Sequence, residues 1–269
     1  MLRTRVLTAL VLLAVLLAVL FWLPPAAGIG FVAAVVLLGA WEWAAFAGLV
    51  QPAGRLLYVL ATAALGALAW RLTGRTGDWL LVMQGAALWW AAAFVWLCLW
   101  PHAVNRAAAA LAGLAVLVPA WLGLARLMAV AAPERGAALL FYMLLVVWAA
   151  DIGAYFAGRR YGRVKLAPAV SPNKTWEGVV GGTLLGLVVA LAGARWFHAP
   201  LVPFAGLGLA VVGSSMVGDL TESMFKRFAH LKDSGSLLPG HGGVLDRIDS
   251  ITSAVPFFVL GLGWLGLLR

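Results

Sequence analysis

Long apolar runs, each of about 20 residues, follow one another along most of the chain. Hydrophobic residues make up 64% of the 269 residues and charged residues only 11%, whereas a soluble domain carries about 25% charged residues. In lipid, only helices and closed barrels can satisfy every backbone hydrogen bond internally. Because the runs show no alternation of apolar and polar residues, we expect an all-α fold, a polytopic bundle of membrane helices.

Nine apolar runs are candidate spans, so we expect about nine transmembrane helices. The first run follows Arg3 and Arg5, a pattern that also fits a cleaved signal peptide. It is longer than the usual signal core, and we expect it to be retained as a helix. We divide the chain into N-terminal helices, 1–105, and a C-terminal region, 106–269, with polar segments 158–175 and 222–249. The predicted spans are 6–23, 28–48, 55–71, 79–100, 107–130, 136–157, 176–197, 201–221 and 250–268.

The placement of Lys and Arg predicts the orientation of the bundle. If the N-terminus lies in the cytoplasm, most of the 19 Lys and Arg residues fall on the cytoplasmic side, as the positive-inside rule requires. Both polar segments then face the cytoplasm. The net charge of +9 mainly reflects this bias and suits contact with anionic membrane lipid. Because the chain has no basic soluble domain, we expect no binding of nucleic acid.

Acidic residues gather in the C-terminal polar segment, at the ends of two predicted spans. Asp219 and Glu222 share one helix face, and Asp246 and Asp249 repeat the same spacing before the last span. Asp151, late in an apolar span, is a further candidate. Carboxylates that converge in an apolar setting repel one another unless a cation lies between them, and oxygen ligands suit Mg²⁺. The alternative is simple pairing with the neighbouring basic residues Lys226, Arg227 and Arg247.

A glycine-rich loop lies between these two groups of acids. Gly242 and Gly243 can let a phosphate approach the main chain closely, although ordinary turns have similar sequences. The loop is preceded by Lys232 and Asp233. His241 can bind a phosphate oxygen or move a proton, or it can be a loop histidine without a chemical role. We therefore predict a phosphate site at this loop.

The other polar segment leads into a predicted helix start. Thr175 is placed to cap that helix, with Glu177 in its first turn. Lys174 then lies at the positive end of the helix, where phosphate binds favourably. Ser171 and Asn173 belong to the same loop. Glu42, the lone acid of the second span, either reaches the cytoplasmic interface or contacts substrate or a helix that bears a cation.

These residues resemble the signature of the phosphatidate cytidylyltransferases, also called CDP-diacylglycerol synthases. The resemblance covers residues 148–269. It rests first on Ser223, Lys226, Arg227, Lys232, Asp233, Gly235, Leu238, Pro239, His241, Gly242, Gly243, Asp246, Arg247, Ile248 and Asp249. A second pattern consists of Asp151, Ala154, Tyr155, Phe156, Gly158, Ser171, Pro172, Lys174, Thr175, Glu177 and Gly178.

The resemblance implies that CTP and phosphatidate react to give CDP-diacylglycerol and pyrophosphate with Mg²⁺. It also implies a homodimeric enzyme of the bacterial inner membrane, with its site open to the cytoplasm. The signature acids of the family hold one divalent cation and a second cation, for which K⁺ is the candidate. By position this role carries over to Asp219, Asp246, Asp249 and Asp151.

On this interpretation each charged residue receives an expected role. Metal at Asp219 and Asp246 contacts the CTP phosphates. Lys174 and Arg247 position the phosphatidate phosphate, Arg247 as a substrate-binding residue. The expected catalytic residues are Asp219, Asp246, Lys226, Arg227, Lys174 and His241. Lys226, Arg227 and Lys232 neutralise the triphosphate. Further expected substrate-binding residues are Ser171, Asn173, Thr175, Glu177, Asp233, Gly242 and Gly243.

Two other classes of function remain open. The first is related CTP chemistry, by a polyprenol or phytol kinase or by a CDP-synthase for ether lipids. The second is a transporter, although transporters place charges near the middle of the bilayer and often show internal repeats. Here the acids lie toward one side, and we find no repeat.

Overall fold

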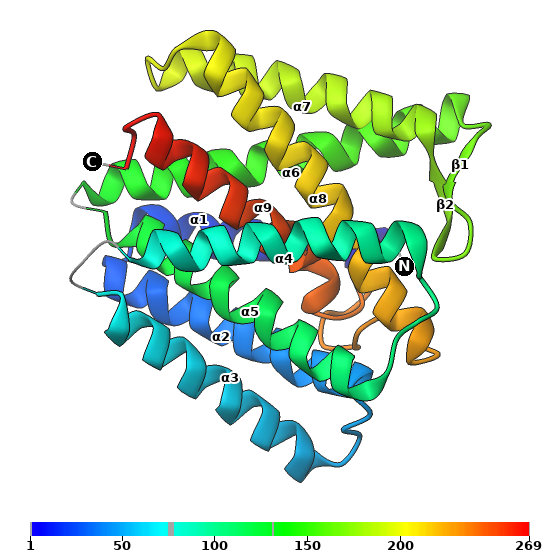
Figure 1. Ribbon diagram of the computed structural model, residues 1–269. Helices are drawn as coiled ribbons and strands as arrows, with labels where there is room; N and C mark the ends of the chain where they lie inside the picture. The colour runs from blue at the N-terminus through cyan, green and yellow to red at the C-terminus, as the bar shows by residue number, and fades with distance from the viewer. Residues whose placement is uncertain (1, 75–77, 131, 269) are drawn as a thin grey trace.

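The structure is a computed structural model, and it describes residues 2–74, 78–130 and 132–268. These residues form a bundle of nine helices and one small hairpin of two strands (Figure 1). The helices are α1 (Leu2–Phe21), α2 (Pro25–Phe46), α3 (Pro52–Leu72), α4 (Trp79–Leu99), α5 (Arg106–Met128), α6 (Pro133–Tyr161), α7 (Trp176–Trp196), α8 (Leu201–Phe228) and α9 (Leu245–Trp264). The strands are β1 (Lys165–Ala167) and β2 (Ser171–Thr175).

Local sequence signals explain where several helices begin. Pro25, Pro52 and Pro133 each lie in the first turn of a helix, where the missing N–H costs nothing. The side chains of Asn105 and Thr175 each accept a hydrogen bond from a backbone N–H three residues further on, at 2.8 and 3.2 Å. The predicted cap at Thr175 is thus confirmed.

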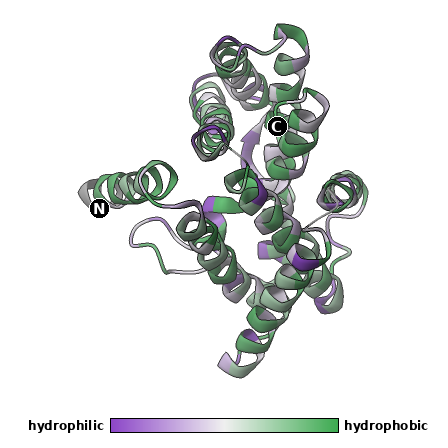
Figure 2. Cartoon of the chain, turned by 90° about the vertical axis from the view of Figure 1, so that its left-hand side faces the viewer, coloured by the Kyte–Doolittle hydropathy of each residue, from purple (hydrophilic) through white to green (hydrophobic). Residues whose placement is uncertain are grey.

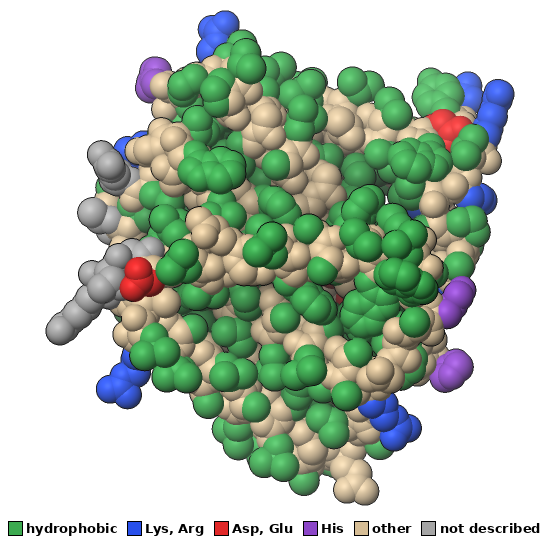
Figure 3. All heavy atoms as spheres, viewed as in Figure 1, with side chains coloured by type: hydrophobic (Ala, Val, Ile, Leu, Met, Phe, Trp, Pro, Cys, Tyr) green, Lys and Arg blue, Asp and Glu red, His purple; other side chains and the backbone are tan. Residues whose placement is uncertain are grey.

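The described helices fit a membrane, and the predicted all-α polytopic bundle is confirmed. Seven of them, α2 to α8, are long and apolar enough to cross a bilayer by length and composition. The apolar part of α1, Val6–Phe21, is shorter, and α9 begins with charged residues. Apolar side chains cover most of the face seen in Figure 3, and Lys and Arg lie at its edges.

Three helices extend beyond their predicted spans on the side of the polar segments. Helix α6 continues to Tyr161 rather than ending at 157, and α8 continues to Phe228 rather than ending at 221. Helix α9 begins at Leu245 rather than at 250. The predicted spans ended where hydropathy fell, but the helices continue with a charged face. The segment 222–249 is therefore helical at both ends, and its loop is shortened to 229–244.

The hairpin between α6 and α7 is the one element that the sequence analysis missed. Its strands pair antiparallel, with Lys165 opposite Thr175 and Ala167 opposite Ser171. A turn closes it, since Val170 N–H donates to Ala167 O at 3.1 Å. The segment that was interpreted as a loop before a helix is therefore a strand that runs directly into α7.

Helix α9 lies in the middle of the bundle and packs against α2, α4, α5, α6 and α8. Helices α6, α7 and α8 pack together on one side, and α2, α3 and α5 on the other (Figure 1). Helix α1 stands at the edge of the bundle (Figure 2). The division at 105 stays a prediction, and α2 packs across it against α5 and α9.

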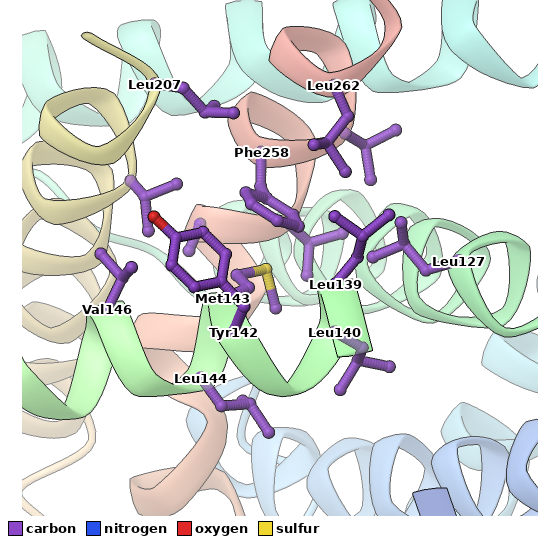
Figure 4. Close-up of a cluster of buried hydrophobic side chains, with 14 of the residues drawn as sticks. Leu127, Leu139, Leu140, Tyr142, Met143, Leu144, Val146, Leu207, Phe258 and Leu262 are labelled. Atoms are coloured by element: carbon purple, nitrogen blue, oxygen red, sulfur yellow. The ribbon is translucent and has the colours of Figure 1, made fainter. Parts of the chain in front are cut away.

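The centre of the bundle is filled by interlocking apolar side chains. One cluster joins Tyr142 and Met143 of α6 to Phe258 of α9 and Leu207 of α8 (Figure 4). A second cluster, nearer the polar segments, packs Trp43 of α2 against Phe225 of α8, with ring centroids 5.2 Å apart. This second cluster holds the C-terminal end of α8 in place beside α2.

Candidate active site

Charged side chains from four elements meet at one end of the bundle, the right-hand side in Figure 1. They come from α6, from strand β2, from the last three turns of α8 and from the first turns of α9. Two ion pairs organise them, one through Lys174 and one through Lys226. The helical extensions described above place these charges, because each acid lies on a continuous helix rather than on a mobile loop.

The first ion pair joins the hairpin to α8. Lys174 Nζ lies 2.6 Å from Asp219 Oδ2, and both side chains are about one-third exposed. Ser223, one turn further along α8, donates a longer hydrogen bond of 3.4 Å to Asp219 Oδ1. Asp151 of α6 and Asp249 of α9 both lie close enough to interact with the charge of Asp219. Carboxylates on α6 and α9 thus lie within electrostatic range of Asp219 on α8.

The second ion pair is buried and joins α8 to α9. Lys226 Nζ lies 2.7 Å from Asp246 Oδ1 and 2.5 Å from Glu222 Oε2. The exposed fraction of the Glu222 side chain is 2% and that of Asp246 is 7%. The contact with Glu222 lacks hydrogen-bond geometry, so both oxygens of this buried carboxylate are without a hydrogen bond in the described chain.

Backbone groups of the glycine-rich loop bind the other oxygen of Asp246. Asp246 Oδ2 accepts hydrogen bonds from the backbone N–H of Ser234 at 3.0 Å and of Gly243 at 2.9 Å. Burial by itself raises the pKa of Asp246, but the hydrogen bonds from Lys226, Gly243 and Ser234 outweigh it and hold the pKa below its usual range. Asp246 is therefore an ionised carboxylate that fixes the loop.

Glu42 reaches the same loop from α2. Its carboxylate accepts hydrogen bonds from Ser234 Oγ at 2.9 Å and from the backbone N–H of Val244 and Leu245 at 3.1 and 2.8 Å. One of our two interpretations placed the Glu42 side chain at the membrane interface. That interpretation is wrong, because the residue is only 2% exposed. It caps the start of α9, where a negative charge is favoured by the free N–H groups and the helix dipole.

Ser234 links Glu42 to Asp246 and was missed in the sequence analysis. Besides donating to Glu42, Ser234 Oγ accepts a hydrogen bond from the Asp246 N–H at 3.3 Å. Its own N–H binds Asp246 Oδ2. The position after Lys232 and Asp233 was its only local signal, and its partner on α2 lies 192 residues away.

The glycines of the loop have structural reasons to be glycine. Gly240 and Gly242 have positive φ angles of 77° and 84°, which L residues rarely adopt. A Cβ at Gly243 would collide with the Ser234 and Glu42 side chains, and one at Gly235 would collide with Glu42. Gly243 was expected to contact substrate. Close packing around Glu42 is by itself a sufficient reason for a glycine at this position.

Two cavities border the charged cluster, and the smaller of them is the more polar. The larger, about 690 Å³, lies between α6, α7, α8 and the hairpin, and its lining includes Asp151, Ser171, Asn173, Lys174, Thr175 and Asp219. The smaller, about 560 Å³, is lined by Lys232, Asp233, Gly240, His241, Gly242 and Arg247. Asp151 and Asp219 thus lie in the wall of the larger cavity and Arg247 in the wall of the smaller one.

Two predicted binding residues make structural contacts outside these cavities. The Glu177 carboxylate accepts hydrogen bonds from the Val164 N–H at 3.2 and 3.3 Å and so holds the base of the hairpin. Arg227 Nε donates to Val170 O at 3.2 Å and ties the tip of the hairpin to the last turn of α8. Thr175 lines the larger cavity while it caps α7.

The donor set of the cluster suits a hard cation, although the cluster is not arranged as a finished metal site. In the part of the chain that the structure describes, no group of three or more His, Cys, Asp or Glu side chains is arranged to hold a metal. Lys174 and Lys226 instead neutralise the acids. Carboxylate oxygens such as those of Asp219, Asp249 and Asp151 are nevertheless donors of the kind that suit Mg²⁺.

Comparison with known proteins finds relatives along nearly the whole chain. A family model described as "Cytidylyltransferase family" matches residues 3–264. The phosphatidate cytidylyltransferase of Pseudomonas aeruginosa is 46% identical over 275 residues, covering 98% of this chain and 99% of its own. The protein of the same name from Haemophilus influenzae is 41% identical, covering 96% of this chain and 97% of its own. That of Bacillus subtilis is 45% identical over 48% of this chain and 49% of its own.

Proposed function

The chain belongs to the cytidylyltransferase family, and we propose that it transfers the cytidylyl group of CTP to phosphatidate. The products are CDP-diacylglycerol and pyrophosphate, for phospholipid synthesis. One observation carries the proposal: relatives that bear the name phosphatidate cytidylyltransferase match the chain almost from end to end. The two cavities that border the charged cluster support it, because the reaction must bring two anions together.

We assign the larger cavity to CTP and the smaller to the phosphate of phosphatidate. The larger cavity has room for a nucleotide, and Lys174 lies in its wall to receive a phosphate charge. The smaller cavity presents Lys232 and Arg247. This differs from the expected role of Lys174, which was to position phosphatidate, because the residue lies on the hairpin side of the acids.

The reaction needs proximity and charge neutralisation more than acid–base chemistry. A phosphate monoester is already ionised near neutral pH, so its oxygen can attack the α-phosphorus of CTP without a strong general base. The new P–O bond forms as the bond to the β-phosphate breaks, and pyrophosphate leaves with the electron pair. Lys174, Lys232 and Arg247 orient the two substrates, and Lys226 keeps Asp246 and the loop in place.

We further propose that the carboxylates hold Mg²⁺, with K⁺ as a second cation. Asp219, Asp249 and Asp151 are the candidate ligands, and Asp246 is a fourth if Lys226 moves away from it. Bound cations would neutralise the charge of the triphosphate and of the departing pyrophosphate. Glu222 adds a further buried carboxylate, which shares Lys226 with Asp246, and this supports the idea that the cluster can accept more positive charge.

The setting of the enzyme is part of the proposal. We propose a multi-pass protein of the bacterial inner membrane, with its N-terminus and site at the cytoplasm, where CTP is present. The excess of Lys and Arg in the predicted cytoplasmic segments supports that orientation. We also propose a homodimer.

Turnover of labelled CTP by the purified protein tests the activity. With phosphatidate in detergent, label in the cytidine moiety should enter the lipid, and label in the γ-phosphate should leave as pyrophosphate. Removal of Mg²⁺ should stop the reaction, and removal of K⁺ should slow it. Transfer of γ-label into lipid would contradict the proposal and indicate a lipid kinase instead.

A further inference from the structure

An apolar cavity of about 600 Å³ lies between α1 and the rest of the bundle. Its walls come from five helices, for example through Leu12 of α1, Val35 of α2, Leu124 of α5, Leu144 of α6 and Ile251 of α9. We call it the α1 pocket. None of the chemistry described above uses it.

One end of the α1 pocket is polar. His241 and Arg247 line both this pocket and the smaller polar cavity, so the two spaces meet at these side chains. His241 Nδ1 is buried there and has no hydrogen-bond partner among the described residues. A cation and an unsatisfied ring nitrogen at the mouth of an apolar pocket suit a molecule with an anionic head and an apolar tail.

The depth of the α1 pocket suits part of a lipid chain. Its lining extends from Val244, the residue before α9, to Thr252, which corresponds to about 12 Å along the helix axis. One leaflet of the hydrocarbon core is roughly 15 Å deep. Thr8 donates a hydrogen bond to Pro239 O at 3.2 Å, so this part of α1 lies at the loop. The pocket therefore begins at the polar cavity and extends into the apolar part of the bundle.

Helix α1 forms a loosely packed wall of this pocket. It lies at the edge of the bundle (Figure 2) and packs mainly against α2 and α6. Leu7, Leu10 and Val11 on its outer side are half-exposed or more, as expected for side chains that face lipid. From Val6 onward, its buried side chains are Val19 and Leu20, toward its end. Helix α1 therefore has lipid-facing side chains on its outer side and the α1 pocket on its inner side.

We propose that the α1 pocket binds one acyl chain of phosphatidate, with the phosphate at Arg247 and His241. This inference rests on the proposed function. It makes α1 and α2 part of the substrate site, although both lie outside the region that carries the signature residues. It also gives the smaller polar cavity its substrate, since an acyl chain in the α1 pocket leads directly to that cavity.

Tryptophan substitutions that fill the pocket test the proposal. L12W and V35W should raise the apparent KM for long-chain phosphatidate by about tenfold or more, because each displaced methylene weakens binding about fourfold. The apparent KM for dihexanoyl phosphatidate and for CTP should stay within about twofold of wild type. The matched control is L10W on the outer side of α1, which should behave as wild type. Equal effects on long and short chains, or equal effects of L12W and L10W, would overturn the proposal.

A binding readout separates this inference from the proposed activity. Long-chain phosphatidate with a diazirine in one acyl chain, irradiated with the protein in dodecyl maltoside, should label α1, α2 and α6 at the pocket. Excess phosphatidate should compete, and phosphatidylcholine should not. Labelling spread over the outer faces of α3 and α4 would overturn the pocket. Pocket labelling without turnover of CTP would instead count against the proposed activity alone.

Discussion

Glu42 joins parts of the chain that lie between 192 and 203 residues apart, and it does so with a single buried carboxylate. Two backbone N–H groups and the Ser234 hydroxyl donate to it. A buried carboxylate in an apolar bundle is costly unless its oxygens are satisfied, and here three donors satisfy them. Glu42 therefore acts on the site through the loop that it holds, and we regard it as a positioning residue.

We expect E42Q to weaken both stability and turnover. The amide replaces one acceptor oxygen with an N–H₂ group that faces N–H donors, which costs roughly 1–3 kcal/mol of the free energy of unfolding. The loop and Asp246 then lose their fixed position, so kcat should fall at least tenfold. Thermal unfolding in detergent and turnover of labelled CTP measure the two effects. E134Q, in the first turn of α6, is the control and should change neither.

Substitution of Asp219, unlike that of Glu42, should have a large effect on activity and a small effect on stability. Its ion pair with Lys174 is partly exposed, and such pairs contribute about 0–1 kcal/mol. We expect D219N to reduce turnover at least a hundredfold while the unfolding temperature stays near that of wild type. K174A should mainly raise the KM for CTP. Near-normal turnover of D219N would remove Asp219 from the proposed cation site.

Gly243 gives a test of close packing at the scale of one methyl group. We expect G243A to be destabilised by a few kcal/mol and to lose most activity, because the new Cβ would meet Ser234 and Glu42. G206A is the matched control, since a Cβ at this glycine of α8 meets no atom within 4 Å. It should be neutral or slightly stabilised, as expected for alanine in a helix. If G243A and G206A unfold at the same temperature, Gly243 does not need to be glycine for the reason given.

At the scale of elements, the hairpin between α6 and α7 is held in place by residues outside it, one of them on the distant helix α8. Strand β2 carries Lys174, and its position depends on Glu177 at the base and on Arg227 at the tip. Arg227, on α8, thus helps to fix the position of the hairpin. The hairpin forms one wall of the larger cavity, so its position decides the shape of the proposed CTP site.

Removal of the Arg227 contact should therefore affect CTP binding more than chemistry. We expect R227M to raise the KM for CTP several-fold and to change kcat little, because Lys174 stays on the strand but the strand moves. R160M is the control, since Arg160 is exposed at the end of α6 and stacks on Tyr161. Steady-state kinetics with varied CTP measures both. A fall in kcat without a change in KM would assign Arg227 a role at the reacting groups instead.

The comparison of sequence and structure shows which elements can be predicted from local signals. The apolar runs and the Thr175 cap depend on neighbouring residues, and both were predicted. The predicted eighth span ends at 221, where hydropathy falls. Helix α8 continues to Phe228, because a helix can extend past the membrane with a charged face. The hairpin was missed because a segment as short as Ser171–Thr175 becomes a strand only by pairing with Lys165–Ala167.

The site residues also divide into those that local sequence signals identify and those that only the folded structure reveals. Asp219, Asp246 and the lysines could be selected because charge is rare in this chain and therefore informative. Their pairing could not be predicted, because Lys174 and Asp219 come from different elements and meet only in the folded bundle. Ser234 and the exact role of Glu42 depend on contacts across almost the whole chain, and no local pattern contains that information.

At the scale of the whole molecule, the structure places the loops of alternate helices at opposite ends. The N-terminus, the hairpin and the loop 229–244 lie toward one end, and the C-terminus lies toward the other (Figure 1). An odd number of helices connects the two ends, as expected for a bundle in which successive helices reverse direction. The orientation of this bundle in the membrane decides whether CTP can reach the site.

Single cysteines test that orientation, because Cys98 is the one cysteine of the chain and C98S removes it. Ser236 is exposed in the loop at the site, and His198 is exposed in the turn between α7 and α8 at the other end. In the C98S background, we expect S236C to react with a membrane-impermeant maleimide only in inside-out vesicles, and H198C only in intact spheroplasts. The bias of Lys and Arg toward the site end is the physical reason. Labelling of S236C in spheroplasts would place the site on the outer face, where CTP is absent, and would contradict the proposed cytoplasmic access.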